Sequence, residues 1–298
     1  MNLLQTESAW GARGQGSQHG TMTLRTLWPF LAITFGVGWG LGMLLAFFGE
    51  QIEAMFGEIG PANPVYLLLV YSPAIAALVL VGRHYGVSGL GSFLRRLTLW
   101  RMPRAWWAFL LLGIPAVVYL AAVVAGTIGD PFPFSPWYAL LPATALALFF
   151  GPVEEIGWRG VGLPLLQRRF TPLGAALIIG FFWALWHVPA FLFSGTAQSE
   201  WSFVPFFIGV VALSVIVTPM FNAAKGSILL AALFHFQMMN PAFPDADPWD
   251  KLIWVLVAVI VVAVNRKTML TRGSGVTEVL MRDAGPVHST VPGAPAGR

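Results

Sequence analysis

Eight apolar runs, separated by short polar or charged stretches, constrain this chain more than any other feature. They cover Leu27–Phe48, Pro64–Val81, Trp106–Thr127, Tyr138–Pro152, Leu173–Phe193, Phe203–Phe221, Ser227–Met239 and Leu252–Val264. Hydrophobic residues occupy 57% of the 298 positions and charged residues only 10%, too few to cover the surface of a soluble domain. Apolar runs of this kind are typical of membrane-crossing helices. We therefore predict an all-α, polytopic membrane bundle of about eight transmembrane helices.

The charges between the runs predict how the bundle is oriented. If both termini are cytoplasmic, the inner segments hold all of the 17 Lys and Arg residues except Arg159 and Lys251. The outer loops then carry Glu50, Glu53, Glu58, Asp130, Glu200, Asp245, Asp247 and Asp250. This asymmetry follows the positive-inside rule. We expect an integral protein of a bacterial plasma membrane with lipid as its partner, and no nucleic acid, because the basic residues flank apolar runs.

Composition divides the chain into three parts. Residues 1–26 are polar and Gly-rich and predict a disordered cytoplasmic lead, residues 27–265 hold the apolar runs, and residues 266–298 predict a disordered cytoplasmic tail. The chain has no cysteine, which excludes disulfides, thiolate metal sites and cysteine nucleophiles.

Ionisable residues inside the runs gather in three places. A charge within a span costs about 2.5 kcal/mol or more, so it marks function by default. Glu155 and Arg159 are four residues apart on one helix and predict an internal ion pair that supports the site. Glu154 points about 100° away from Glu155 around the helix and is free for other work. The three stretches are Gly151–Gly160, Phe182–His187 and Phe234–Asn240.

The spacing of these stretches predicts that their side chains meet. The fourth helix should continue past Pro152 to a turn near Phe170, because the intervening residues keep a helical apolar pattern. At about 1.5 Å per residue, Glu154 and His187 then lie at nearly equal depth on the two arms of a hairpin. His235, on another helix, reaches the same half of the membrane or its middle.

This fourth helix would be unusually long. A helix from Tyr138 to Phe170 measures about 50 Å, against about 30 Å for the hydrocarbon core. It must therefore tilt, break at Pro142, Pro152 or Pro164, or project into the cytoplasm.

The three side chains suit hydrolytic chemistry. A carboxylate in a dry cavity beside an imidazole can polarise a water as general base. The two histidines could ligate a metal, polarise the water or donate to an oxyanion. Glu154, His187 and His235 could also hold Zn²⁺ with one position left for water, although the chain lacks the HExxH motif.

At these residues the sequence resembles the CAAX-protease and bacteriocin-processing family, whose pattern is EExxxR, then FxxxH, then HxxxN. Glu154-Glu155-Ile-Gly-Trp-Arg159 matches the first element, and Trp183-Ala-Leu-Trp-His187 matches the second with Trp in place of Phe. We interpret that exchange as mild, since either ring fills the space. The third element departs from the pattern: the residue four after His235 is Met239, and the asparagine is Asn240. Gln237 is a less favoured substitute.

The resemblance covers residues 142–241 and implies a membrane-embedded peptidase. By that likeness Glu154 activates the attacking water with His187, while His235 with Asn240 stabilises the oxyanion. Family enzymes remove the C-terminal tripeptide from prenylated CAAX proteins or process other membrane-associated peptides. The resemblance therefore predicts an intramembrane endopeptidase of the CAAX-processing type, a metalloprotease if zinc is bound, in a protease domain spanning residues 27–265.

Two other functions stay open at this point. Intramembrane Glu and His also form proton relays, and Gly36, Gly38, Gly40 and Gly42 in the first run favour the close helix packing of a proton-coupled transporter. The chain lacks the repeat symmetry typical of transporters. The displaced Asn240 keeps a non-catalytic scaffold or immunity protein on the same fold as the other alternative.

Overall fold

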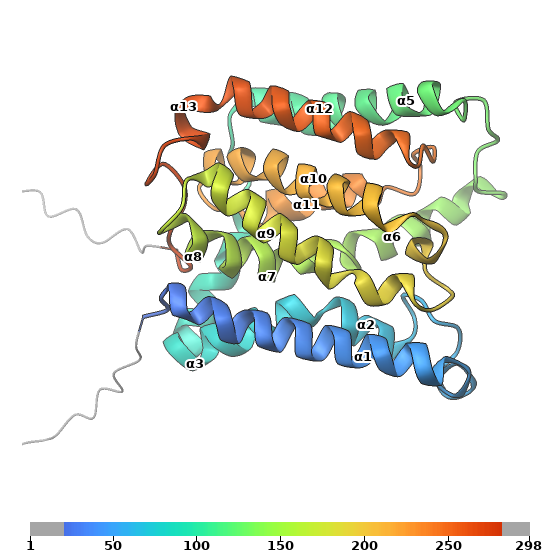
Figure 1. Ribbon diagram of the computed structural model, residues 1–298, viewed down its shortest axis with the longest axis horizontal. Coiled ribbons are helices and arrows are strands. Elements are labelled where there is room, and N and C mark those ends of the chain that lie inside the picture. The colour runs from blue at the N-terminus through green and yellow to red at the C-terminus, as the bar shows by residue number, and fades with distance from the viewer. Residues whose placement is uncertain (1–20, 282–298) are drawn as a thin grey trace, which may run out of the picture.

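The computed structural model describes residues 21–281, and all regular structure in that range is helical. The longer helices lie side by side along a common direction, joined by loops at the two ends of the bundle (Figure 1). The predicted all-α membrane bundle is confirmed. Short 3₁₀ or π-helical turns, labelled η, connect or interrupt the α-helices, which are α1 (Leu27–Phe56), α2 (Pro64–Val70), α3 (Ser72–Leu94), α4 (Arg104–Ala108), α5 (Ile114–Ala125), α6 (Leu140–Phe149), α7 (Glu155–Gly157), α8 (Leu163–Gln167), α9 (Pro172–Trp186), α10 (Phe203–Ala223), α11 (Ile228–Met238), α12 (Trp249–Val264) and α13 (Arg266–Met269).

Each of the eight predicted runs coincides with one or more of these helices, but the helices differ in length. Within residues 21–281, five helical segments are long and apolar enough to cross a membrane: Leu24–Phe56, Ser72–Thr98, Arg104–Ala125, Trp137–Gln167 and Phe203–Ala223. Helices α9 and α11 are apolar but shorter, with 15 and 11 residues. Five of the predicted runs thus lie in helices of full spanning length, and the others lie in shorter helices.

Helices α9 and α11 are short because each begins at a capping residue and ends just before a proline. Thr171 caps the start of α9 by accepting a hydrogen bond from the Gly174 N–H at 3.2 Å, and Ser227 caps α11 in the same way. Pro189 ends α9, because proline disfavours helical backbone at the residue before it. The chain likewise leaves α11 at Met239, two residues before Pro241. Irregular backbone at membrane depth is tolerated where it is buried or lines a cavity. The ends of α9 and α11 both border a cavity.

The fourth span continues past Pro152, as predicted, and its helix ends at Gln167. Of the predicted ways to fit its length, the structure uses a break at Phe150–Gly151, directly before Pro152. After the break, the 3₁₀ turn η5 (Pro152–Glu154) is followed by α7 and then by the π-helical turn η6 (Trp158–Gly162). Helix α6 consequently diverges from α7 and α8 (Figure 1). The wide π turn follows directly on the residues that carry the acidic motif.

Residues 266–281 differ from the predicted disordered tail, because they are held against the bundle. Met269 and Val279 are almost fully buried, and the Val276 carbonyl accepts a hydrogen bond from Gln167 Nε2 at 2.8 Å. The Val279 carbonyl accepts another from Arg96 Nη1 at 2.9 Å. Residues 266–281 have no apolar periodicity, so these individual contacts were not predicted. The rest of the predicted tail, 282–298, and residues 1–20 of the predicted lead lie outside the described residues.

The remainder of the predicted lead, residues 21–26, is also folded. Leu24–Thr26 form a 3₁₀ turn, η1, directly before α1, and Met22 is buried. The Met22 N–H donates to the Tyr85 hydroxyl at 2.8 Å. The folded part of the chain therefore begins before Leu27.

Two of the four glycines in α1 bring it close to the end of α9. A Cβ on Gly38 would lie 2.4 Å from Trp186 Nε1, and a Cβ on Gly42 would lie 2.3 Å from Pro189 Cβ. Nothing lies within 4 Å of a Cβ on Gly36 or Gly40, which face away from the bundle. The alternation thus places one glycine stripe against the segment that carries His187.

We expect Gly38→Ala to destabilise the protein by about 1–3 kcal/mol, because the added methyl overlaps the Trp186 indole. Gly40→Ala is the matched control and should leave stability unchanged or slightly raised, since alanine is the better helix former and meets no neighbour there. Apparent melting temperatures of both variants in detergent measure the difference. Equal melting temperatures would contradict this packing role.

Candidate active site

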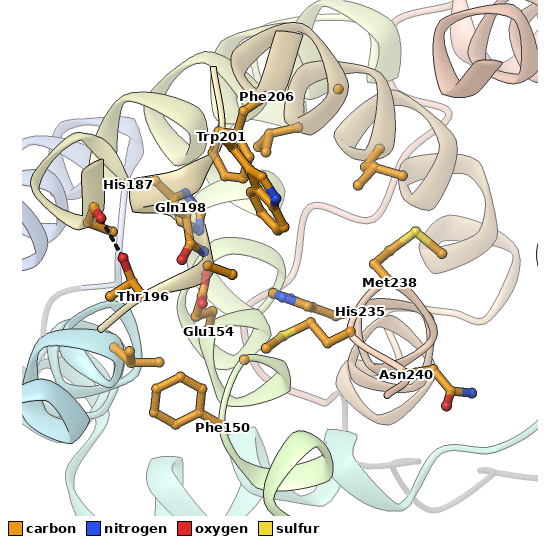
Figure 2. A pocket seen from close by; sticks show the side chains of 18 of the residues that line it. Phe150, Glu154, His187, Thr196, Gln198, Trp201, Phe206, His235, Met238 and Asn240 are labelled. Atoms are coloured by element: carbon orange, nitrogen blue, oxygen red, sulfur yellow. Dashed lines mark hydrogen bonds between the residues drawn. The ribbon is translucent and has the colours of Figure 1, made fainter. Parts of the chain in front are cut away.

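A cavity of about 530 Å³ lies between the helices, and it brings together the ionisable residues predicted to meet. Glu154 from η5, His187 from the end of α9 and His235 from α11 all line it, as Figure 2 shows. Most of the other lining side chains are apolar or aromatic, among them Tyr66, Trp186 and Phe206. The cavity thus combines an apolar wall with a few convergent polar groups, the usual character of a small-molecule or peptide site.

Glu154 is held by one hydrogen bond. Its side chain is buried, with 4% exposed, and its Oε2 accepts from the indole Nε1–H of Trp183 at 2.7 Å. Among the described residues, no group binds its other oxygen, Oε1. The carboxylate is therefore fixed by one oxygen and has the other available to a molecule in the cavity.

His187 is oriented by the backbone of its own helix. Its Nδ1 lies 2.8 Å from the Trp183 carbonyl oxygen, which can only accept, so Nδ1 carries the proton. In the neutral ring Nε2 is then an acceptor. The ring lies edge-on to Trp186 and Phe206, with centroids 4.8 and 5.0 Å apart, which fixes its plane.

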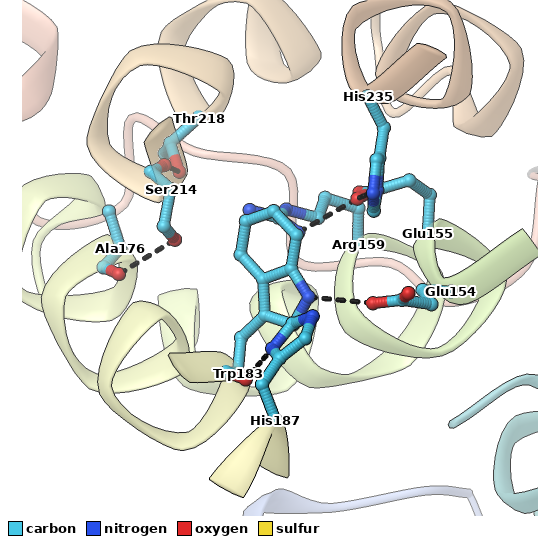
Figure 3. A network of polar contacts seen from close by, with 9 residues as sticks. All are labelled: Glu154, Glu155, Arg159, Ala176, Trp183, His187, Ser214, Thr218 and His235. Carbon is cyan, nitrogen blue, oxygen red and sulfur yellow. Dashed lines mark hydrogen bonds and ion pairs between the residues drawn. The ribbon is translucent and has the colours of Figure 1, made fainter. Parts of the chain in front are cut away.

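His235 belongs to a chain of charged groups. Its Nδ1 lies 2.8 Å from Glu155 Oε1, and the same oxygen accepts from Arg159 Nη1 at 3.0 Å (Figure 3). The predicted Glu155–Arg159 pair is thus present, and it continues to His235, which the sequence did not indicate. A Cβ on Gly151 would lie 2.9 Å from His235 Nε2, so the glycine leaves room beside that nitrogen.

Trp183 connects all of these groups, although it was not among the predicted site residues. Besides donating to Glu154, its ring covers the Arg159 guanidinium at 4.2 Å, and its centroid lies 5.3 Å from that of His235. Figure 3 shows the indole at the centre of the network. Interpreting Trp for Phe as a mild exchange was wrong, because phenylalanine has no N–H to donate to Glu154.

Comparison with known proteins finds a matching family and a similar protein. Residues 135–240 match the family described as Type II CAAX prenyl endopeptidase Rce1-like, a range that contains every predicted site residue. The chain is also similar to CAAX prenyl protease 2 of Methanococcus maripaludis, with 29% identity over 177 residues. That similarity covers 53% of this chain and 65% of the relative, so the chain spans less than two thirds of the relative's length.

Among the described residues, no hydrogen bond joins Asn240 to His235. Asn240 Nδ2 donates to Gln237 Oε1 at 3.1 Å, while its Oδ1 accepts from the Ala242 N–H at 3.1 Å. Gln237 in turn donates to the Leu110 carbonyl at 2.9 Å. The predicted His235–Asn240 pair is therefore not formed, because α11 ends before the asparagine and the turn carries it away (Figure 2). The partner of His235 is Glu155.

Among the described residues, the predicted zinc ligands Glu154, His187 and His235 do not form a three-ligand cluster. Within residues 21–281 no three His, Asp or Glu side chains lie close enough together to hold a metal ion. The Trp183 ring contacts both histidines, and its N–H donates a hydrogen bond to one oxygen of Glu154. His235 Nδ1 is hydrogen-bonded to Glu155. The steps derived below accordingly use only the side chains of the chain.

We expect Glu155→Gln to destabilise the protein by about 3–5 kcal/mol, because it leaves the buried Arg159 without its counter-charge. The apparent melting temperature in detergent measures this. Glu154→Gln is the matched control and should melt near the wild-type temperature, since no cation is hydrogen-bonded to Glu154. Equal destabilisation by the two substitutions would contradict the assignment of Glu155 as the structural carboxylate.

Proposed function

We propose that this protein is an intramembrane endopeptidase of the CAAX-processing type, acting on prenylated or hydrophobic membrane-associated peptides. One observation carries the proposal: a buried carboxylate with one oxygen held by Trp183 and one available, in a cavity that it shares with two histidines. The family match over residues 135–240 and the name of the archaeal relative support the same activity.

The first step proposed is attack by water. Glu154 takes a proton from a water that His187 Nε2 orients by accepting its second hydrogen. The water oxygen forms a bond to the scissile carbonyl carbon, and the π electrons move to the carbonyl oxygen. His235 donates a hydrogen bond from Nε2 to this oxyanion when its ring carries two protons, with Nδ1–H donated to Glu155 Oε1.

The second step breaks the peptide bond. The oxyanion reforms the carbonyl, the C–N bond cleaves, and the proton held by Glu154 passes to the leaving amine. Both products are then free, and Glu154 is again ionised. Zinc has no part in either step, and elemental analysis of the purified protein tests the predicted zinc separately.

We expect Glu154→Gln to lower kcat at least 100-fold while the protein stays folded, because glutamine keeps the shape but cannot accept the proton. The assay uses quenched peptides, prenylated and unprenylated, with protein in nanodiscs. Glu200→Gln, at an exposed carboxylate in η8 (Ala197–Glu200), is the matched control and should cleave at the wild-type rate. Wild-type protein that is folded yet cleaves neither peptide would favour the scaffold alternative.

Trp183→Phe should lower kcat by about 10- to 100-fold with little change in KM, because it keeps a ring and removes the N–H that orients Glu154. Trp186→Phe is the matched control: it removes an indole donor of the same kind, which bonds to Ser72 Oγ at 3.0 Å instead of Glu154. Similar kcat values for the two variants would show that the Trp183–Glu154 bond has no role in positioning.

A further inference from the structure

The exposed loop residues that line the cavity lie at one end of the bundle. Its lining includes loop residues from three connections: α1–α2, α9–α10 and α11–α12. Among them Pro61, Ala197 and Asp245 are exposed, and we call these three residues the cavity mouth. All three loops lie at the end of the bundle opposite to the start of α1, on the right in Figure 1.

The opposite end is closed by buried polar contacts. Arg96 is 2% exposed and donates to the carbonyls of Gly160 at 2.7 Å, Gly226 at 2.8 Å and Val279 at 2.9 Å. Gln167, also buried, bonds to Asn222 and to the Val276 carbonyl. These bonds connect the 3₁₀ turn η2 (Arg95–Thr98), η6, α8, α10 with the turn after it, and residues 276–279. A peptide approaching from this end would have to break them.

Acidic residues gather at the mouth end of the bundle, and basic residues gather at the closed end. Within residues 21–281, the acidic residues of the loops and helix ends at the mouth end are Glu50, Glu53, Glu58, Asp130, Glu200, Asp245, Asp247 and Asp250. Lys251 is the basic residue there, and it is paired with Asp247 at 3.1 Å and Asp250 at 2.8 Å. The closed end and the helix portions near it carry the acidic Glu278 and twelve basic residues: Arg25, Arg83, Arg95, Arg96, Arg101, Arg104, Arg168, Arg169, Lys225, Arg266, Lys267 and Arg272.

We propose that the cavity mouth faces the extracytoplasmic side of the membrane, so that the substrate is a peptide segment presented from that side. Basic segments stay in the cytoplasm, which puts the closed end there and the mouth outside. A prenylated protein C-terminus in the cytoplasm would meet the closed end. The orientation stands on charge and cavity geometry alone, while the identification of the ligand as a substrate rests on the proposed function.

The absence of cysteine from the chain makes a direct test simple. Ala197→Cys places one thiol at the cavity mouth, and Thr98→Cys places one at an exposed position of the closed end. A membrane-impermeant maleimide added to spheroplasts should label only the mouth variant, and added to inverted vesicles only the Thr98 variant. The reverse pattern, or equal labelling of each variant in both preparations, would overturn the proposal.

A second measurement separates the orientation from the activity, because labelling needs no catalysis. A membrane-impermeant quenched peptide added to spheroplasts should be cleaved by wild type and not by Glu154→Gln. Cleavage only in inverted vesicles would overturn the orientation and leave the proposed function standing. Labelling as expected, without cleavage in either preparation, would overturn the proposed function and leave the orientation standing.

Discussion

The site depends on a single buried oxygen, Oε1 of Glu155, which accepts from both Arg159 and His235. In a low-dielectric interior the guanidinium needs this counter-charge, and the imidazole needs a fixed partner to hold its ring. The two bonds fasten α11 to the helix that bears Glu154. Glu155 therefore has a structural role, while its neighbour Glu154 is the proposed general base. The two carboxylates of one Glu-Glu pair thus have different roles.

Trp183 adds a second layer to this arrangement. Its ring covers Arg159, its N–H holds Glu154 and its carbonyl accepts from His187 Nδ1. One residue of α9 thereby orients both the proposed base and a histidine, and the glycines of α1 let that helix end approach closely. The cavity keeps its shape because rigid rings and short backbone contacts surround it.

Much of this architecture was predictable because local sequence determines it. Apolar runs give the helices, and the four-residue spacing of Glu155 and Arg159 gives their ion pair. The bonds from Trp183 to Glu154 and from Glu155 to His235 were not predictable, since they join residues 29 and 80 positions apart. The expected His235–Asn240 pair failed for a local reason: one extra residue before Pro241 places the asparagine beyond the helix end.

The C-terminal segment has a consequence for biosynthesis. Val276 and Val279 complete the hydrogen bonds of Gln167 and Arg96, so the last-made part of the described chain closes the layer beneath the site. A ribosome must release these residues before that layer can be finished. A nascent chain whose helices are all inserted, but whose residues 276–279 are still in the ribosome, thus lacks part of the support for its own cavity.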